Sequence, residues 1–309
     1  MNNYNDVLKI YYEIGEDIGR RYCIITDADK KLNEIDIPEE IDGCPVERIG
    51  KKAFLGCKGL RRVRIPGSVS LIGEWAFAFC DNLTHVELAR IETELGKGVF
   101  KNDKKLQEIH VYELSSDAGD DLSEAEREDK VVMISRLMAA APVIMDAEYL
   151  LDIMRSGDDE WLCKWDTKLS HILSLKDDDG YHLYVLCGEE DLHFDYEEYL
   201  EYNREKKSSL CMLRLVNDIA LNDDDRILLI KYLKDHTCGC DSEAAIRVLL
   251  KRHGDDRDYY GMMLKIGAIN EDNLEAVLNM MGDRHAQMKA YLMEECGNKD
   301  SDFFDDLML

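Results

Sequence analysis

Apolar side chains return at a fixed interval over the first third of the chain. Residues 60–82 align with residues 83–105, so equivalent positions lie 23 residues apart. Each unit has three apolar positions in the pattern L-x-x-V-x-I, and these are Leu60, Val63, Ile65, Leu83, Val86, Leu88, Leu106, Ile109 and Val111. A period in the twenties predicts a solenoid, because one such unit cannot bury its apolar side without a neighbouring unit.

Two kinds of segment alternate within each unit. The L-x-x-V-x-I pattern predicts a short strand with three inward side chains, which Pro38 or Pro66 ends. The I-G-x-x-A-F segment that follows predicts a turn, with glycine where a β-carbon would hinder it and phenylalanine in the interior. These glycines and phenylalanines are Gly50, Gly73, Gly96, Phe54, Phe77 and Phe100.

The runs IPEEIDGCPVERIGKKAFLGC and IPGSVSLIGEWAFAFC resemble BspA-type leucine-rich repeats, whose hallmark is I-P-x-x-V-x-x-I-G-x-x-A-F-x-x-C. The resemblance covers about residues 20–112, and residues 21–29 fit an N-terminal capping strand. In the third unit Ala89 replaces the proline and Asp103 replaces the cysteine, which suits a terminal coil with fewer neighbours. The resemblance implies a curved scaffold with a β-sheet face used for binding, and it implies no catalytic residues.

From Ser123 onward the apolar spacing becomes that of helices. Ser123 and Glu126 predict a capping box at the start of the first helix. Trp161 and Trp165 share a stripe with other large apolar residues, which indicates core positions rather than a binding site.

Two later stretches are similar to each other. Residues 221–233 parallel residues 269–281, and residues 242–254 parallel residues 284–297. The pattern predicts a helix-pair repeat of irregular length, with glycines near the helix ends. It is similar to divergent ankyrin-like or other α-repeat arrays, although the T-P-L-H signature is absent.

These patterns predict an α+β two-domain fold, in which a short leucine-rich-repeat β-solenoid precedes an all-α, helical-repeat-like domain. The expected boundaries are 1–113 for the repeat domain with its N-terminal cap, 114–122 for a linker, and 123–309 for an acidic all-helical domain.

The third and fifth positions of each predicted strand point outward and carry mostly charged side chains. They are Glu34, Asp36, Arg62, Arg64, His85, Glu87, Glu108 and His110. Opposite charges on neighbouring strands support each other by about 0.2–1 kcal/mol per pair, so one interpretation is a charge ladder that satisfies itself. The other is a polar binding stripe centred on Arg62 and Arg64, with His85, Glu87 and His110 beside them.

Trp75 and Phe79 stand where the other two units carry small or polar residues. We therefore expect these positions to face outward, with the two rings side by side on one turn of helix. Clustered exposed aromatic side chains mark contact sites. The pair is expected to pack either against the helical half of the same chain or against another chain.

Acidic and basic residues are distributed unevenly along the chain. Residues 1–113 hold 20 acidic and 17 basic side chains, whereas the remainder carries nearly all of the net charge of −26. A field of this size repels nucleic-acid backbones and anionic lipid, so neither is expected as a partner. The acidic half is either a solvated surface or a face that fits a basic partner.

The start of the chain lacks the basic end and uninterrupted apolar core of a signal peptide. No window approaches the roughly 20 apolar residues that a membrane span needs. We expect a cytoplasmic protein whose ten cysteines are reduced, with export by a route without a cleavable signal left open.

Motifs for phosphate loops, dinucleotide binding, zinc proteases and serine hydrolases are absent from the sequence. His236, Cys238 and Cys240 form a suggestive cluster, but three ligands are too few for a closed zinc site. We therefore predict no metal, no cofactor and no catalytic residues. The leading functional hypothesis is a non-enzymatic protein–protein interaction module or scaffold. An acidic charge-mimic regulator of a basic partner is the alternative, and an enzyme in the helical half is less favoured.

Overall fold

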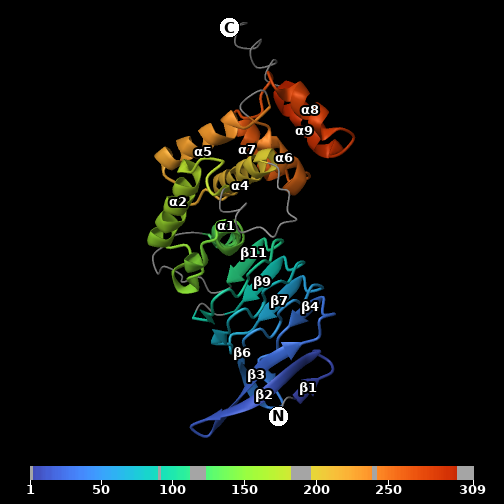
Figure 1. The fold of residues 1–309 in the computed structure, drawn as a ribbon, viewed down its shortest axis with the longest axis vertical. Helices are drawn as coiled ribbons and strands as arrows, with labels where there is room; N and C mark the ends of the chain where they lie inside the picture. Colours follow the sequence, from blue (N-terminus) through green and yellow to red (C-terminus); the bar gives the residue numbers. More distant parts are fainter. Residues whose placement is uncertain (1–2, 90–91, 112–122, 182–195, 239–241, 298–309) are drawn as a thin grey trace. The chain divides into compact units, whose positions relative to one another are not determined.

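The computed structural model describes residues 3–89, 92–111, 123–181, 196–238 and 242–297, shown as coloured ribbon in Figure 1. The chain divides into two compact units, Met1–Leu169 and Ser170–Leu309. The first contains the repeats and the helical segments that follow them, and the second contains further helices. The expected linker at 114–122 lies outside the described residues.

Two sheets form the solenoid of the first unit, and Figure 1 shows their strands stacked coil upon coil. Sheet A follows the order β1 (Asn3–Asn5), β2 (Ile10–Asp17), β3 (Arg20–Ala28), β6 (Cys44–Ile49), β8 (Leu71–Ile72) and β10 (Glu94–Leu95), with β5 (Glu40–Ile41) paired to β6. Sheet B follows the order β11 (Glu108–Val111), β9 (His85–Leu88), β7 (Arg62–Ile65) and β4 (Glu34–Asp36). All neighbours in sheet B are parallel, as successive turns of a solenoid must be.

A column of stacked aromatic rings runs through the core of the solenoid. Phe54 stacks on Phe77 with ring centroids 4.9 Å apart, and Phe77 stacks on Phe100 at 5.9 Å. The rings and the apolar strand positions are buried. The predicted solenoid is therefore confirmed.

The turns after sheet A need glycine because neighbouring coils approach closely there. A β-carbon on Gly73 would lie 2.6 Å from the backbone nitrogen of Lys51, and one on Gly96 would lie 2.6 Å from that of Glu74. The amide of Phe54 donates to the carbonyl oxygen of Ala76 at 2.7 Å in the next turn. Turn-to-turn hydrogen bonds thus continue the ladder past the ends of the strands.

The N-terminal end of the solenoid is closed by a hairpin. β3 pairs in parallel with β6, and β2 pairs antiparallel with β3. β3 coincides with the capping strand expected at 21–29. Sheet A therefore extends three strands beyond β6, whereas sheet B ends at β4.

Helix α1 (Glu124–Val143) packs on β11 at the other end of the solenoid, as Figure 1 shows. Ser123 and Glu126 form the predicted capping box. The short helices η1 (Glu148–Leu150) and η2 (Ile153–Arg155) and the helix α2 (Asp159–Ser174) follow. The Trp165 ring nitrogen donates to the carbonyl oxygen of Leu137 at 3.0 Å, and Trp161 and Trp165 are core residues as predicted.

The described residues of the second unit form helices joined by turns, and this unit begins within the last turn of α2. The helices that lie wholly within its described residues are α4 (Tyr196–Val216), α5 (Asp223–Asp235), α6 (Ala244–Arg252), α7 (Arg257–Lys265), α8 (Leu274–Met281) and α9 (Ala286–Gly297). α4 packs against α5, α6 and α7, and α9 packs against α7 and α8. The four stretches with similar sequences, 221–233, 269–281, 242–254 and 284–297, each contain a helix. Among the helices of the described segments, none is both long and apolar enough to span a bilayer.

Candidate functional site

The register of sheet B assembles the outward side chains into two rows. One row runs through Glu34, Arg62, His85 and Glu108, and the other runs through Asp36, Arg64, Glu87 and His110. Each row crosses all four strands, because equivalent residues of successive coils pair directly. These eight residues define the strand face of sheet B. Acidic and basic residues alternate along the row through Asp36, whereas Arg62 and His85 are neighbours in the row through Glu34.

The ion pairs of Arg62 and Arg64 with Glu87 are loose at their Nε atoms. The Nε atoms of Arg62 and Arg64 each lie 3.8 Å from a carboxylate oxygen of Glu87, too far for a hydrogen bond. The two guanidinium side chains are 49% and 56% exposed, while Glu87 is 18% exposed. Pairs of this kind contribute at most about 1 kcal/mol and are screened by salt.

A residue that the sequence did not single out bounds the strand face at its C-terminal end. The Nε atom of Arg136 in α1 donates to the Glu108 carboxylate at 3.2 Å, and the His85 ring lies 3.8 Å from the same carboxylate. Nothing in the helical pattern of α1 indicates which strand it covers. The face is therefore bounded by α1 beside β11 and ends at β4 on the other side.

Trp75 and Phe79 lie on a different part of the coil, in the turn that follows sheet A. Their rings stack with centroids 6.3 Å apart and an interplanar angle of 24°. Trp75 is half-buried over Gly98 of the next coil, and Phe79 is 38% exposed. The candidate residues therefore form two separate surfaces. One is the strand face of sheet B, and the other is the pair of Trp75 and Phe79.

The backbone at the aromatic pair differs from the helical turn that was expected. Both Trp75 and Phe79 have a φ of 60°, in the left-handed region. The equivalent residues of the coils before and after share this conformation, so the turn geometry belongs to the repeat. A helix cannot include such residues, because left-handed φ breaks its hydrogen-bond ladder.

The repeat cysteines and Asp103 are buried structural groups. Burial raises the pKa of the Cys57 thiol to about 11 and also raises the pKa of the Cys80 thiol. Thiols held in the protonated form are poor nucleophiles. Burial likewise raises the pKa of Asp103 to about 8, although the backbone amide of Cys80 opposes this by donating to the carboxylate.

The HTCGC segment is only partly described, because Cys240 lies outside the described residues. His236 places its Nδ1 atom 2.8 Å from the carbonyl oxygen of Tyr232, and the Cys238 thiol lies 3.2 Å from the sulfur of Met280. Within the part of the chain that the structure describes, no three His, Cys, Asp or Glu side chains are grouped to hold a metal ion. The expectation of no metal at HTCGC stays a prediction.

A partly buried polar network in the second unit has a structural explanation. Lys207 of α4 donates to the carbonyl oxygen of Leu175 and to the Asp177 carboxylate at 2.8 Å, and Arg204 donates to the same carboxylate at 3.0 Å. Burial opposes ionisation of Asp177, but these hydrogen bonds hold its pKa below the ordinary value. The network fastens the segment after α2 to α4, and it presents no reactive group.

Comparison with known proteins identifies the repeats. Residues 27–122 match the family model described as "BspA type Leucine rich repeat region", in six copies. A search of curated proteins returns no match to the chain.

Three solved structures are similar over about a third of this chain. A leucine rich cell surface protein from Faecalibacterium prausnitzii is 24% identical, over 35% of this chain and 30% of that one, with a TM-score of 0.31. A leucine rich repeat protein from T. pallidum is 27% identical, over 34% and 58% of the two chains, with a TM-score of 0.27. A leucine-rich repeat protein from Bacteroides ovatus is 19% identical, over 33% and 35%, with a TM-score of 0.22.

The chain spans less than two thirds of the length of each of these structures. The family match covers the coils whose period and packing are described above. Residues 27–122 are thus similar to BspA-type leucine-rich repeat regions, and a helical part follows them.

Proposed function

We propose that this protein is a non-enzymatic protein–protein interaction module whose main contact surface is the strand face of sheet B. The match of residues 27–122 to a leucine-rich repeat model supports a protein–protein interaction or surface-binding role. The observation that carries the proposal is the exposure of the Arg62 and Arg64 guanidinium groups, whose Nε atoms each lie 3.8 Å from the Glu87 carboxylate.

Loose ion pairs of this kind are suited to exchange on binding. A guanidinium group has five N–H donors in a planar fork that matches a carboxylate. A partner's carboxylate can form the bidentate geometry that Glu87 does not offer to the Nε atoms. Exchanging one weak surface ion pair for a stronger one costs little stability, and arginine is enriched where proteins bind one another.

The experiment compares two charge reversals of equal size. The test variant is Arg62→Glu with Arg64→Glu, and the control is Lys101→Glu with Lys104→Glu, two exposed basic residues outside sheet B. Each protein is cross-linked in a lysate of the native host, and captured proteins are quantified by mass spectrometry. We expect at least one protein captured by the wild type and the control to be lost in the test variant. Equal capture by all three would overturn the strand face as the contact.

The non-enzymatic part of the proposal has its own test. A screen for hydrolase, transferase and phosphatase activity on the purified chain is expected to show no turnover. Reproducible turnover that a single substitution on the strand face abolishes would contradict the proposal.

A further inference from the structure

The two sheets of the solenoid are unequal at their N-terminal end. Sheet A continues past β6 through β3, β2 and β1, but in the described residues sheet B ends at β4, which pairs only with β7. Among the residues that the structure describes, no strand occupies the position beside β4 where one more coil would place a strand of sheet B. An unpaired sheet edge is a template for an added strand.

The backbone of β4 is arranged to accept such a strand. The amide of Ile37 donates to the carbonyl oxygen of Arg64, and the amide of Arg61 donates to that of Asn33. Backbone groups of successive residues point to opposite edges of a strand. Those of Asn33 and Ile37 therefore face β7, whereas those of Glu34 and Asp36 face the open edge.

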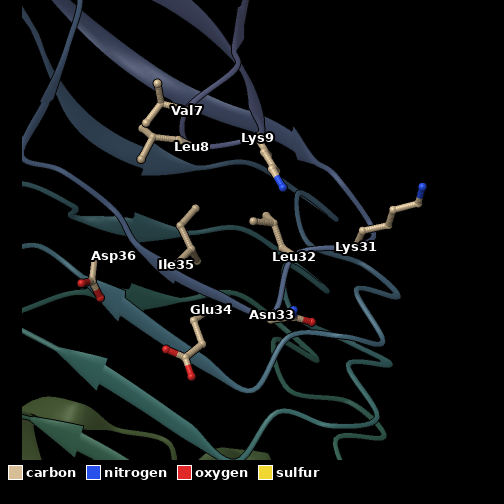
Figure 2. A pocket seen from close by; sticks show the side chains of 9 residues that line it. All are labelled: Val7, Leu8, Lys9, Lys31, Leu32, Asn33, Glu34, Ile35 and Asp36. Carbon is tan, nitrogen blue, oxygen red and sulfur yellow. The ribbon is translucent and has the colours of Figure 1, made fainter.

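A pocket of about 470 Å³ lies beside this open edge. It is lined by the turn between β1 and β2 and by β4 with the residues before it, namely Val7, Leu8, Lys9, Lys31, Leu32, Asn33, Glu34, Ile35 and Asp36. Figure 2 shows Leu32 and Ile35 on the side that faces this turn, with Val7 and Leu8 opposite them. Val7 is 89% exposed, so an apolar side chain stands at the rim where an incoming residue can cover it.

The acidic side chains of β4 favour an added strand that carries basic side chains. On its paired side, β4 places Glu34 and Asp36 beside Arg62 and Arg64 of β7. A strand on the open side meets the same two carboxylates, so opposite charge is favoured there as well. A second copy of β4, paired antiparallel about Ile35, would instead set Glu34 against the copy's Asp36, and like charges directly opposite are destabilising.

We propose that the open edge of β4 binds an extended segment of a protein partner as a fifth strand of sheet B. The segment carries the pattern basic–apolar–basic. Its basic side chains lie beside Glu34 and Asp36, and its apolar side chain enters the pocket against Val7 and Leu8. This mode joins two chains by main-chain hydrogen bonds and takes its specificity from alternate side chains. Glu34 and Asp36 also belong to the strand face, but the added strand binds through the backbone of the open β4 edge, whereas the proposed function is carried by Arg62 and Arg64. Binding of a peptide at the β4 edge and partner loss on charge reversal of Arg62 and Arg64 can therefore fail separately.

A peptide whose sequence is taken from this chain can serve as the probe for the open edge of β4. The heptapeptide LRRVRIP, with the sequence of residues 60–66, contains the strand that already pairs with β4 on its other side. A fluorescent, end-blocked form is titrated with the full chain and followed by anisotropy. We expect saturable binding, and we expect the peptide LEEVEIP to bind at least tenfold more weakly. A third peptide, N-methylated on alternate residues, keeps the charge but loses main-chain hydrogen bonds, and it is also expected to bind at least tenfold more weakly.

Two charge-reversal variants separate this site from general attraction to an acidic protein. Glu34→Lys with Asp36→Lys is expected to weaken LRRVRIP binding at least tenfold. Glu294→Lys with Glu295→Lys, on the exposed side of α9, carries the same charge change and is expected to have little effect. Circular dichroism checks that both variants fold. If LRRVRIP binds the first variant as well as the wild type, or only the α9 variant loses binding, the proposal is overturned.

Hydrogen exchange locates the peptide directly. Saturation with LRRVRIP is expected to slow exchange at the amides of Glu34 and Asp36, which face the open edge. Binding that leaves both amides unprotected would place the peptide elsewhere and overturn the added strand. The readout remains usable if the charge-reversal variant fails to fold, because it needs only the wild-type chain.

Discussion

The Asp103 carboxylate accepts a hydrogen bond from the backbone amide of Cys80 at 2.8 Å, within the buried column where the two preceding coils carry cysteine. Its second carboxylate oxygen has no hydrogen-bond partner among the described residues. A buried carboxylate that is only half satisfied is costly to ionise. The third coil thus accommodates aspartate at the position of the repeat cysteine, and as a result its core contains a carboxyl group that can titrate.

Asp103 is expected to make the first unit less stable as the pH rises. Its pKa is raised to about 8, so the folded state retains a proton that an unfolded aspartate releases near pH 4. The contribution of the Asp103 carboxyl group to the free energy of unfolding is most favourable below about pH 4. Between there and about pH 8 it falls by up to about 1.4 kcal/mol per pH unit, and above about pH 8 it is constant.

The change Asp103→Asn tests this dependence, because asparagine resembles the protonated acid. Relative to wild type, the free energy of unfolding of the variant is expected to rise steadily from weakly acidic to weakly alkaline pH. Denaturant unfolding at several pH values measures the difference. The exposed Asp6→Asn serves as the control for general charge effects. A difference between Asp103→Asn and wild type that does not change with pH would contradict the buried titration.

Gly73 is expected to tolerate no β-carbon. In Gly73→Ala the new atom meets the backbone of Lys51 at 2.6 Å, and backbone cannot move aside without breaking the turn ladder. We expect a loss of about 3 kcal/mol or more in the free energy of unfolding. Gly67→Ala is the matched control, since its nearest neighbour is a Glu39 oxygen at 3.9 Å, and it is expected to change stability little. Thermal unfolding compares the two.

Much of this arrangement could be predicted from the sequence, because the 23-residue period encodes the register. Residues one period apart, such as Arg62 and His85, become direct neighbours in a parallel sheet. The period says nothing about segments that do not repeat. Neither the β1–β3 extension that leaves β4 open nor the contact of Arg136 with Glu108 has a signal in local spacing. The left-handed backbone at Trp75 also escaped prediction, because an aromatic residue rarely takes it.

Replacing both Trp75 and Phe79 with lysine is expected to leave the repeat fold intact. Lys52 already occupies the equivalent position with a φ of 63°, so lysine is compatible with the turn. Circular dichroism checks the fold. If the pair contacts another chain, the double variant loses a partner or a dimer with an unchanged melting temperature. If it contacts the chain's own helical half, the melting temperature falls. Unfolding of the repeats themselves would show that the aromatic pair is part of the core.

Salt distinguishes charge mimicry from an apolar interface. If the acidic half occupies a basic site on a partner, the affinity is expected to fall steeply as ionic strength rises, since exposed charges are screened within about 8–10 Å near physiological salt. Titrations with the captured partner at low and high salt measure this. An affinity that is indifferent to salt would contradict mimicry and indicate an apolar contact.

The solenoid is expected to need α1 as its C-terminal cap. Leu137, Met138 and Ala141 of α1 are fully buried, and α1 packs on β11. Without the helix, β11 becomes an exposed sheet edge over an open core, which favours aggregation. A fragment ending at Ser174, the last residue of α2, is therefore expected to be monomeric and to unfold cooperatively.

A fragment ending at residue 113, the boundary expected from composition, is expected to aggregate or to lose several degrees in melting temperature. Light scattering and thermal unfolding of the two fragments decide between the boundaries. Equal solubility and equal melting temperature would mean that the repeats cap themselves. In that case α1 covers β11 without stabilising it, and the repeat domain ends at 113. The outcome also sets which fragment is suitable for isolating the strand face and the β4 edge from the acidic helices.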